Sequence, residues 1–240
     1  MYEEELNFSK EIWDKEWSSS NQLERKDNLV LFKYKYFISP WLKNLPSNSK
    51  VCEIGCGNGQ WLSFLRDIRP DIEYTGVDIS SVGLDIIQKK GFNSIYFDIS
   101  KTHENYPSFD AVFSWGVIEH LPVPELALYN HFRMSNKFIA FDVPSKRSPA
   151  TRWLEFRNRV KKMSLKKDWM INGMRYKPSD LNSLISRLFV WDPSWEIIHK
   201  GSNYSVLPNI HPLLKRIDNL LPDHFRSLFG HNFGYVLKKN

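Results

Sequence analysis

The chain has 240 residues and a mass of 28.4 kDa, 42% of its residues are hydrophobic, and its formal net charge is +6. This size and composition allow a sizeable buried core, and no internal repeat, low-complexity segment or bilayer-length apolar run is present, which excludes repeat and transmembrane architectures. Because Met1–Glu5 lacks the basic and apolar segments of a signal peptide, we expect a cytoplasmic protein with reduced thiols.

Two helices are predicted ahead of the first strand. Asn7–Trp17 and Leu23–Leu42 both carry aromatic residues at helical spacing, among them Trp13 and Trp17. We interpret residues 1–45 as a helical cap on the rest of the chain.

The most informative stretch begins at the first predicted strand. Val51–Ile54 is a short apolar strand that breaks into a loop with glycines at positions 55, 57 and 59. Glycine lets the backbone approach a ligand closely because it has no Cβ and tolerates positive φ. The apolar spacing of Gln60–Arg66 predicts a helix that starts at the loop. A ligand there would lie beside the free N–H groups of a helix N-terminus.

Three ligand classes use such a turn, and the neighbouring residues separate them. A P-loop requires Gly-Lys-Ser/Thr after its glycines, whereas Gln60 and Trp61 follow here. A dinucleotide fingerprint requires the spacing G-x-G-x-x-G to seat a pyrophosphate, whereas this loop reads G-x-G-x-G with Glu53 two residues ahead of it. An acidic residue at that point would repel a pyrophosphate and suits a cationic or amine-bearing ligand.

Acidic residues also end the next two predicted strands. Tyr74–Ser80 predicts a second strand that reaches Asp78, whose carboxylate can accept two hydrogen bonds from the vicinal hydroxyls of a ribose. Ser94–Ile99 predicts a third strand with Asp98 at its end. A fourth strand is predicted from Phe109 onward, and a Glu-His-Leu step follows it at positions 119–121.

These motifs stand in the order found in the class I S-adenosylmethionine-dependent methyltransferases, which the chain resembles over roughly residues 50–145. The Glu-His-Leu step resembles that of the ubiquinone-biosynthesis-type small-molecule methyltransferases. The resemblance implies S-adenosyl-L-methionine as the cofactor, a helical cap that covers it, and Asp98 beside the adenine amino group. The implied cofactor-binding residues are Glu53, Gly55, Gly57, Gly59, Asp78, Ile79, Asp98, Ile99 and Ser114.

His120 is the candidate general base. Methyl transfer requires alignment of the acceptor and, for an oxygen or nitrogen acceptor, removal of a proton. His120 follows the fourth strand at the carboxyl edge where open α/β sheets bind ligands, and histidine titrates near neutral pH. The alternative is that it packs against or caps the next segment. Other candidate bases are Tyr176, His211, His224 and Asp142.

No metal site is predicted. Cys52 and Cys56 stand four residues apart without a further cysteine or clustered histidines, which does not make a zinc site. We interpret them as a strand residue and a small loop residue.

Residues 145–178 concentrate the positive charge. They contain eleven Lys and Arg against two acidic residues, whereas the rest of the chain has 22 basic and 25 acidic residues. Trp153, Phe156, Val160 and Met163 fall at helical spacing among the basic residues, which predicts an amphipathic basic helix. One interpretation is a solvated face over a packed stripe. The functional interpretations are an anionic acceptor, which we favour, an anionic membrane surface, and nucleic acid.

The remaining chain completes a sheet. Lys137–Pro144 predicts the fifth strand, Trp195–His199 the sixth and Phe233–Leu237 the last. Between the fifth and the sixth, Pro178-Ser179-Asp180 opens a helix with an apolar stripe and a capping side chain at its start.

The predicted fold is α/β: a Rossmann-like, seven-stranded, mostly parallel sheet with an antiparallel last strand, an N-terminal helical cap and helical insertions. We expect one methyltransferase domain over residues 1–240. Its predicted parts are the cap (1–45), a cofactor-binding core (46–144), the basic insertion (145–178), and a C-terminal half (179–240) with a second insertion (202–232).

The predicted function is methyl transfer from S-adenosylmethionine to oxygen or nitrogen of a small-molecule or saccharide-like acceptor, anionic or lipid-linked. An alternative is an RNA or protein methyltransferase. Amino-directed base methylation usually comes with Asn/Asp-Pro-Pro-Tyr/Phe at the fourth strand, where this chain has Ser114-Trp115-Gly116-Val117. A second alternative is a non-catalytic, S-adenosylmethionine-binding regulatory subunit.

Overall fold

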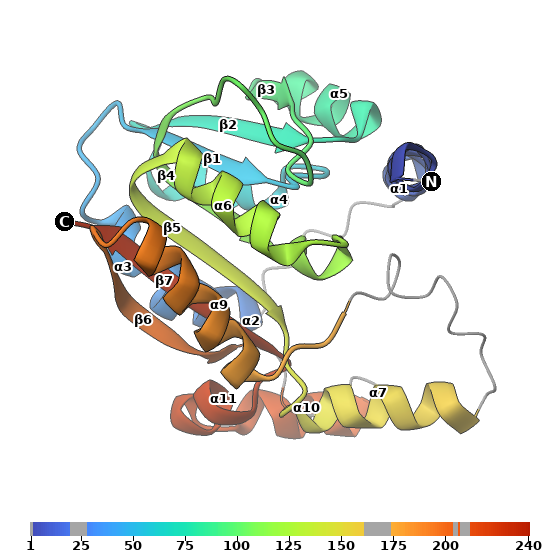
Figure 1. Cartoon of the computed structure of the whole chain (residues 1–240). Helices are drawn as coiled ribbons and strands as arrows, with labels where there is room; N and C mark the ends of the chain where they lie inside the picture. The colour runs from blue at the N-terminus through green and yellow to red at the C-terminus, as the bar shows by residue number, and fades with distance from the viewer. Residues whose placement is uncertain (1, 20–27, 161–173, 204–205, 207–211) are drawn as a thin grey trace. The chain divides into compact units, whose positions relative to one another are not determined.

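The computed structural model describes residues 2–19, 28–160, 174–203, 206 and 212–240 (Figure 1). The strands are β1 (Lys50–Ile54), β2 (Glu73–Asp78), β3 (Asn93–Tyr96), β4 (Phe109–Trp115), β5 (Ser135–Pro144), β6 (Trp195–Asn203) and β7 (Asn232–Lys239). The helical elements are α1 (Tyr2–Ser19), α2 (Asn28–Lys33), the π-helix η1 (Tyr34–Ile38), α3 (Ser39–Leu42), α4 (Gln60–Ile68), α5 (Ser81–Lys89), the 3-10 helix η2 (Ile118–His120), α6 (Pro124–Met134), α7 (Pro149–Val160), α9 (Pro178–Trp191), α10 (Pro212–Leu220) and α11 (Asp223–Phe229).

The strands form one seven-stranded sheet in the order β3-β2-β1-β4-β5-β7-β6. β1 pairs in parallel with β2 and β4, and β2 pairs in parallel with β3. β7 runs antiparallel to β6. The predicted Rossmann-like α/β fold, mostly parallel with an antiparallel last strand, is therefore confirmed.

The chain packs as two compact units. The first consists of Met1–Glu24, Leu45–Val117 and Leu121–Ile139, and the second of Arg25–Asn44, Ile118–His120 and Ala140–Asn240. β5 contributes residues to both units. The single domain expected over residues 1–240 stays a prediction.

The core of the first unit is built around two central strands. Every residue of β1 after Lys50 is buried, as expected for a strand with parallel neighbours on both sides. Cys52, Ile54 and Val112 belong to its apolar cluster, and α4, α5 and α6 pack against β2, β3 and β4. The loop after β1 consequently lies at the carboxyl end of a central parallel strand, where open α/β sheets bind ligands.

The second unit is organised by the β6–β7 ribbon and α9. The ribbon is antiparallel with an irregularity between Ile197 and His199, and α2 and α11 pack against β6. The predicted stripe of α9 is buried at Leu181, Leu184 and Leu188. Removing each such side chain from water contributes roughly 1.5–3 kcal/mol.

Three local predictions need correction. The second N-terminal helix is not uniformly α-helical, because a π-helical turn occupies Tyr34–Ile38. β3 ends at Tyr96, so Asp98 lies two residues beyond the strand. Within the described part of the chain, α9 has no capping side chain at its start. Its N-cap is Lys177, and Pro178 occupies the first helical position, where its fixed φ favours helix initiation.

The basic helix is present as α7, but its aromatic side chains do not pack as a buried stripe. Trp153 is 40% exposed and Phe156 is 58% exposed. The interpretation as a solvated face over a packed stripe therefore does not hold for these two residues.

Some predictions fall on residues that the structure does not describe, namely Met163, the candidate base His211 and the first part of the helix expected from Leu23. Among the described residues, no helix combines the length and apolar character needed to cross a bilayer.

Candidate cofactor and catalytic site

The loop after β1 has the backbone conformation that its glycines allow. The backbone φ angles of Gly55, Gly57 and Gly59 are 67°, 48° and 70°. Residues that carry a Cβ rarely adopt such positive φ values. A Cβ at Gly57 would also collide with the Trp17 ring, and one at Gly55 with Val117. α4 begins directly after Gly59 and so presents its N-terminus at the loop.

Asp78 ends β2 and fastens this loop. Its carboxylate accepts hydrogen bonds from the N–H groups of Gly57 (2.8 Å) and Ser80 (2.9 Å), and the residue is 7% exposed. Burial raises the pKa of this carboxyl; the N–H groups of Ser80, Gly57 and Ile79 oppose that shift, and the charge of Asp14 adds to it. Each carboxylate oxygen keeps further acceptor capacity. The role of Asp78 as acceptor for ribose hydroxyls stays a prediction.

Glu53 lies at the end of β1 and is buried. Burial raises the pKa of the Cys52 thiol and of the Cys56 thiol, and the negative charge of Glu53 contributes to both shifts. Neither thiol is ionised near neutral pH, so neither is a nucleophile. This agrees with their interpretation as a strand residue and a loop residue.

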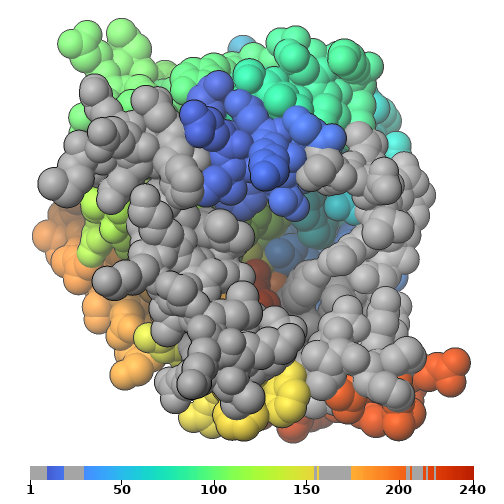
Figure 2. All heavy atoms as spheres, turned by 90° about the vertical axis from the view of Figure 1, so that its right-hand side faces the viewer, coloured from blue at the N-terminus to red at the C-terminus, as the bar shows by residue number. Residues whose placement is uncertain are grey.

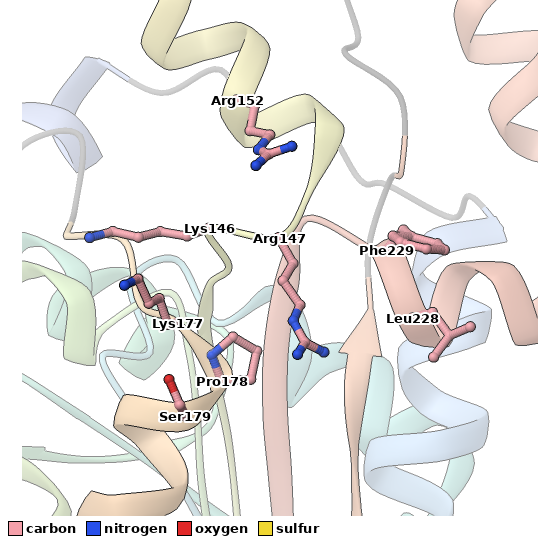
Figure 3. A pocket seen from close by; sticks show the side chains of 8 residues that line it. All are labelled: Lys146, Arg147, Arg152, Lys177, Pro178, Ser179, Leu228 and Phe229. Carbon is pink, nitrogen blue, oxygen red and sulfur yellow. The ribbon is translucent and has the colours of Figure 1, made fainter.

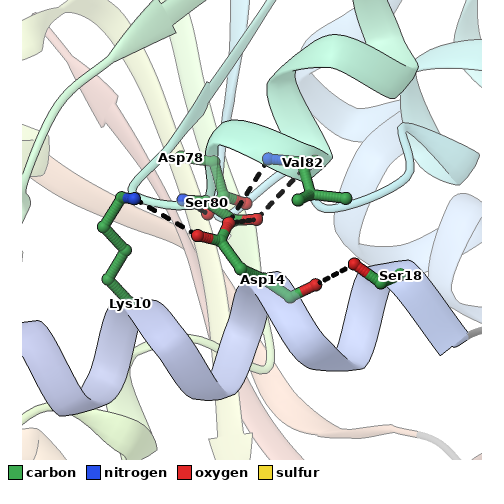
Figure 4. Close-up of polar contacts among 7 residues, drawn as sticks. Lys10, Asp14, Ser18, Asp78, Ser80 and Val82 are labelled. Atoms are coloured by element: carbon green, nitrogen blue, oxygen red, sulfur yellow. Dashed lines mark hydrogen bonds and ion pairs between the residues drawn. The ribbon is translucent and has the colours of Figure 1, made fainter.

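α1 lies over the glycine loop. Asp14 accepts hydrogen bonds from the Ser80 hydroxyl (2.6 Å) and from the Val82 N–H (3.3 Å) at the start of α5, and it pairs with Lys10 (3.2 Å) (Figure 4). Figure 2 shows α1 beside α5 on the surface of this unit. Of the predicted helical cap, α1 is the part that belongs to the unit with the glycine loop, whereas α2, η1 and α3 belong to the second unit.

The Asp98 carboxylate closes a local turn. It accepts hydrogen bonds from the Ser100 N–H (3.0 Å) and the Ser100 hydroxyl (2.5 Å), and Lys101 Nζ lies 3.5 Å away. Ile99 is buried in the apolar cluster of the first unit. The roles of Asp98 beside adenine and of Ile99 at the cofactor stay predictions.

Ser114 forms a hydrogen bond with His131, which no sequence motif indicates. The Ser114 hydroxyl lies 2.9 Å from His131 Nε2, and His131 Nδ1 lies 2.7 Å from the Ala127 carbonyl oxygen. Because a carbonyl only accepts, Nδ1 carries the proton and Nε2 accepts from the serine. Burial lowers the pKa of His131 to about 4, so the ring is neutral. Ser114 therefore orients a buried histidine, and its cofactor role stays a prediction.

The candidate base His120 lies in η2 and is half-buried. Its neighbour Glu119 is 3% exposed, and the Glu119 carbonyl accepts a hydrogen bond from the Met174 N–H (2.7 Å). Burial raises the pKa of Glu119 to about 8; the charge of Asp142 adds to this shift, and those of Arg175 and Lys33 oppose it. A carboxyl that holds its proton at neutral pH is a feature of functional sites.

A buried charge cluster surrounds Glu119 in the second unit. Asp142 is fully buried and pairs with Lys33 Nζ at 2.7 Å. Burial and the charges of Arg175 and Lys33 lower the pKa of His231 to about 4, opposed by Asp142. We define the buried charge cluster as Lys33, Glu119, Asp142, Arg175 and His231.

Of this cluster, only Asp142 is a candidate base from the sequence, and Glu119 enters there only as part of the Glu-His-Leu step. The signal that could have indicated Glu119 is its place beside His120 in the Glu-His-Leu step. Of the other rivals, Tyr176 is half-buried with its N–H bonded to the Pro144 carbonyl (3.0 Å), and His224 is exposed.

The fold and the site together define a class of protein. A parallel sheet with a glycine loop after β1 and a carboxylate at the end of β2 is an arrangement that holds a nucleoside-bearing cofactor. Residues 25–184, which are 160 of the 240, match the family described as "Methyltransferase domain". The chain therefore belongs to this family, and the predicted membership of the S-adenosylmethionine-dependent methyltransferases is confirmed.

Two curated relatives match parts of the chain. The tRNA (carboxymethyluridine(34)-5-O)-methyltransferase ALKBH8 of Mus musculus is 37% identical over 93 residues, which is 36% of this chain and 13% of that protein. A carboxy-S-adenosyl-L-methionine synthase of Campylobacter jejuni is 37% identical over 68 residues, 28% of each chain. The matches thus span less than a third of the length of either relative.

A solved structure shares the fold over the whole chain. The plantazolicin methyltransferase BpumL, in complex with a triazolic desmethylPZN analog and SAH, superposes with a TM-score of 0.62 at 15% identity. The match covers 99% of this chain and 98% of that one.

Proposed function

We propose that the protein transfers the methyl group of S-adenosylmethionine to an oxygen or nitrogen of a small-molecule or saccharide-like acceptor that is anionic or lipid-linked. The observation that carries this proposal is the glycine loop fastened by Asp78 through Gly57 and Ser80. Membership of the methyltransferase family supports the reaction type. The basic residues of the second unit and the absence of an Asn/Asp-Pro-Pro step at β4 in the sequence support the acceptor class.

The residues of the first unit fit the cofactor. S-adenosylmethionine supplies a methyl group already activated by its sulfonium, so the protein has to align the acceptor and take up a proton. Asp78 would accept from the ribose hydroxyls, and Glu53 places a negative charge that suits the cationic part of the ligand. The N–H groups at the start of α4 complete a polar rim around the glycine loop.

His120 is the preferred proton acceptor. A base must be deprotonated to act, and an ordinary histidine is largely neutral above pH 7. Glu119, with a pKa near 8, still holds its proton there. We therefore assign proton removal to His120 and consider Glu119 a rival whose contribution would grow toward pH 8.

RNA is the second acceptor class that a specific observation favours, namely the partial match to a tRNA methyltransferase. A third candidate function is a regulatory subunit that binds S-adenosylmethionine without catalysis. The glycine loop and Asp78 would serve cofactor binding in such a subunit as well. Transfer of a labelled methyl group separates the three readings.

The test is incubation of the purified protein with cell extract and methyl-labelled S-adenosylmethionine, followed by mass spectrometry. Label in a small anionic or lipid-linked product is the expected result. Label in RNA would support the second reading, and S-adenosylhomocysteine binding without any labelled product would support the third. Tighter binding of NAD than of S-adenosylmethionine would overturn the proposal altogether.

His120→Ala should lower turnover by roughly 10² to 10⁴ while leaving S-adenosylhomocysteine affinity nearly intact, because only the proton acceptor is removed. The acid limb of the pH profile should disappear as well. His224→Ala changes an exposed candidate base of the second unit and should keep wild-type turnover if His120 is the base. Wild-type turnover in His120→Ala would move the role to Glu119 or Tyr176.

A further inference from the structure

A basic pocket of about 810 Å³ lies in the second unit, where the two predicted insertions meet. Figure 3 shows Lys146, Lys177 and Ser179 on one side of it and Leu228 and Phe229 on the other, with the Arg147 guanidinium between them. Its described lining residues are Lys146, Arg147, Arg152, Lys177, Pro178, Ser179, Leu228 and Phe229. Basic and apolar side chains thus share one hollow.

Backbone contacts hold this pocket together. Ser145 and Tyr176 form a parallel bridge, and the Lys146 N–H donates to the Tyr176 carbonyl (2.9 Å), which brings Lys146 and Lys177 side by side. The Thr151 Oγ1 atom of α7 lies 3.1 Å from Nδ1 of His231, which follows α11 in the sequence by two residues. Segments from both insertions are therefore fixed at the same place.

The charge of the pocket is one-sided. Four of the described lining residues are basic and none of them is acidic. Among the described residues, Asp180 follows the lining residue Ser179 and accepts a hydrogen bond from its hydroxyl (3.2 Å). Four cations around one hollow repel each other, and a multiply charged anion would relieve that repulsion.

Two residues of α11 form the apolar wall of the pocket. Leu228 is 56% exposed and Phe229 is 37% exposed. The buried Arg226–Asp218 ion pair (2.9 Å) joins α11 to α10 and neutralises the Asp218 carboxylate. Exposed apolar side chains therefore lie directly beside the cationic side chains.

We propose that this pocket binds a phosphate or diphosphate group that carries an apolar substituent. The anion pairs with Arg147, Lys146 and Lys177, because guanidinium and ammonium groups match phosphate oxygens. The substituent lies along Leu228 and Phe229. A nucleic-acid backbone is the less fitting ligand, because the cations converge on one hollow that has an apolar wall and do not follow a track. That the phosphate belongs to the methyl acceptor rests on the proposed function, whereas the binding itself does not.

The test measures binding of octyl phosphate, inorganic pyrophosphate and phosphatidic acid vesicles to the full-length protein. The double variant Arg147→Glu, Lys177→Glu should bind each probe at least about tenfold more weakly, because it replaces two charge-assisted contacts by repulsion. The exposed residues Lys43 and Lys200 of the same unit, changed together to Glu, provide the control of equal charge. Arg147→Lys with Lys177→Arg should retain most of the binding.

A second variant tests the apolar wall. Leu228→Ser should weaken octyl phosphate several-fold and leave pyrophosphate unchanged, since only the alkyl chain contacts this side chain. Val190→Ser, which changes an 85% exposed residue of α9, is its control. Binding of octyl phosphate in solution assigns the ligand to free phosphorylated amphiphiles, and binding of vesicles alone assigns it to a lipid headgroup.

Unaltered binding in the Arg147→Glu, Lys177→Glu variant would overturn the proposal. So would a wild-type protein that binds single-stranded RNA but none of the three phosphate probes. S-adenosylhomocysteine affinity should be the same in all these variants. A protein that binds octyl phosphate but not S-adenosylhomocysteine would contradict the proposed function and leave the pocket assignment standing.

Discussion

Asp78 joins the glycine loop to the strand beside it. Its two carboxylate oxygens already accept hydrogen bonds from the N–H groups of Gly57 and Ser80. A hydrogen bond to a charged acceptor contributes about 1.5 to 3 kcal/mol, so this side chain stabilises the loop. We expect it to accept from a cofactor ribose as well.

Asp78→Ala should weaken S-adenosylhomocysteine binding at least about tenfold, because the ribose contacts and the loop geometry are lost together. Its melting temperature should fall too, since two backbone donors lose their acceptor. Calorimetry below the melting point of the variant measures the affinity. Asp85→Ala, at an exposed position of α5, should match the wild type. Unchanged affinity in a folded Asp78→Ala protein would remove Asp78 from the site.

At the level of elements, the described contacts of α1 with the rest of the first unit include those of Asp14 and Trp17. Asp14 receives hydrogen bonds from both Ser80 and Val82 (Figure 4). The Trp17 ring lies against Gly57. A helix held by such contacts can detach locally at a lower free energy than the core strands. The access of ligands to the glycine loop then depends on this attachment.

Asp14→Ala should expose α1 to protease. Loss of about 1 kcal/mol of hydrogen bonding raises the detached population roughly fivefold. Trypsin cleavage after Lys10 and Lys15, followed by mass spectrometry, should accelerate by that factor. S-adenosylhomocysteine should slow the cleavage if α1 covers the bound cofactor. Glu11→Ala changes an exposed residue of the same helix and should cleave at the wild-type rate. Equal rates for Asp14→Ala and the wild type would show that this contact does not hold the helix.

For the molecule as a whole, the described groups His131, His231 and Glu119 contribute to the dependence of stability on pH. The pKa values of His131 and His231 are lowered by burial to about 4, so their contribution is present above pH 6.5 and is lost as the pH falls toward 4. The pKa of Glu119 is raised by burial to about 8, so the folded state holds a proton that the unfolded state releases above pH 4.5. The contribution of Glu119 to the free energy of unfolding is therefore lost as the pH rises from 4.5 to 8.

The free energy of unfolding should therefore be highest between about pH 6 and 7 and should fall by up to about 1.4 kcal/mol per pH unit from 6.5 to 8. Above about pH 7.5 both histidines are mostly neutral in the folded and the unfolded states, so the fall in the upper part of this interval reports Glu119. Urea denaturation at pH 6.5, 7.2 and 8 measures it. Glu119→Gln should flatten the fall, and Glu125→Gln, at an exposed position of α6, should not. An equally steep fall in Glu119→Gln would assign the effect elsewhere.

The sequence alone predicted the succession of seven strands along the chain and the glycine loop that follows the first of them. Gly55, Gly57, Gly59 and Asp78 could be placed together because the carboxyl ends of neighbouring parallel strands meet at one edge. Their chemistry depends on local backbone conformation and on strand order, and both of these leave a pattern in the sequence.

Only the tertiary structure decided which polar side chains form contacts within the protein. The Ser114 hydroxyl donates a hydrogen bond to His131. The Ser145–Tyr176 bridge brings Lys146 beside Lys177. Glu119 acquires its high pKa from burial near Asp142. These partners are distant in sequence, and no periodic pattern records which of them meet. Burial and pairing arise from the packing of whole elements, and local spacing does not contain that information.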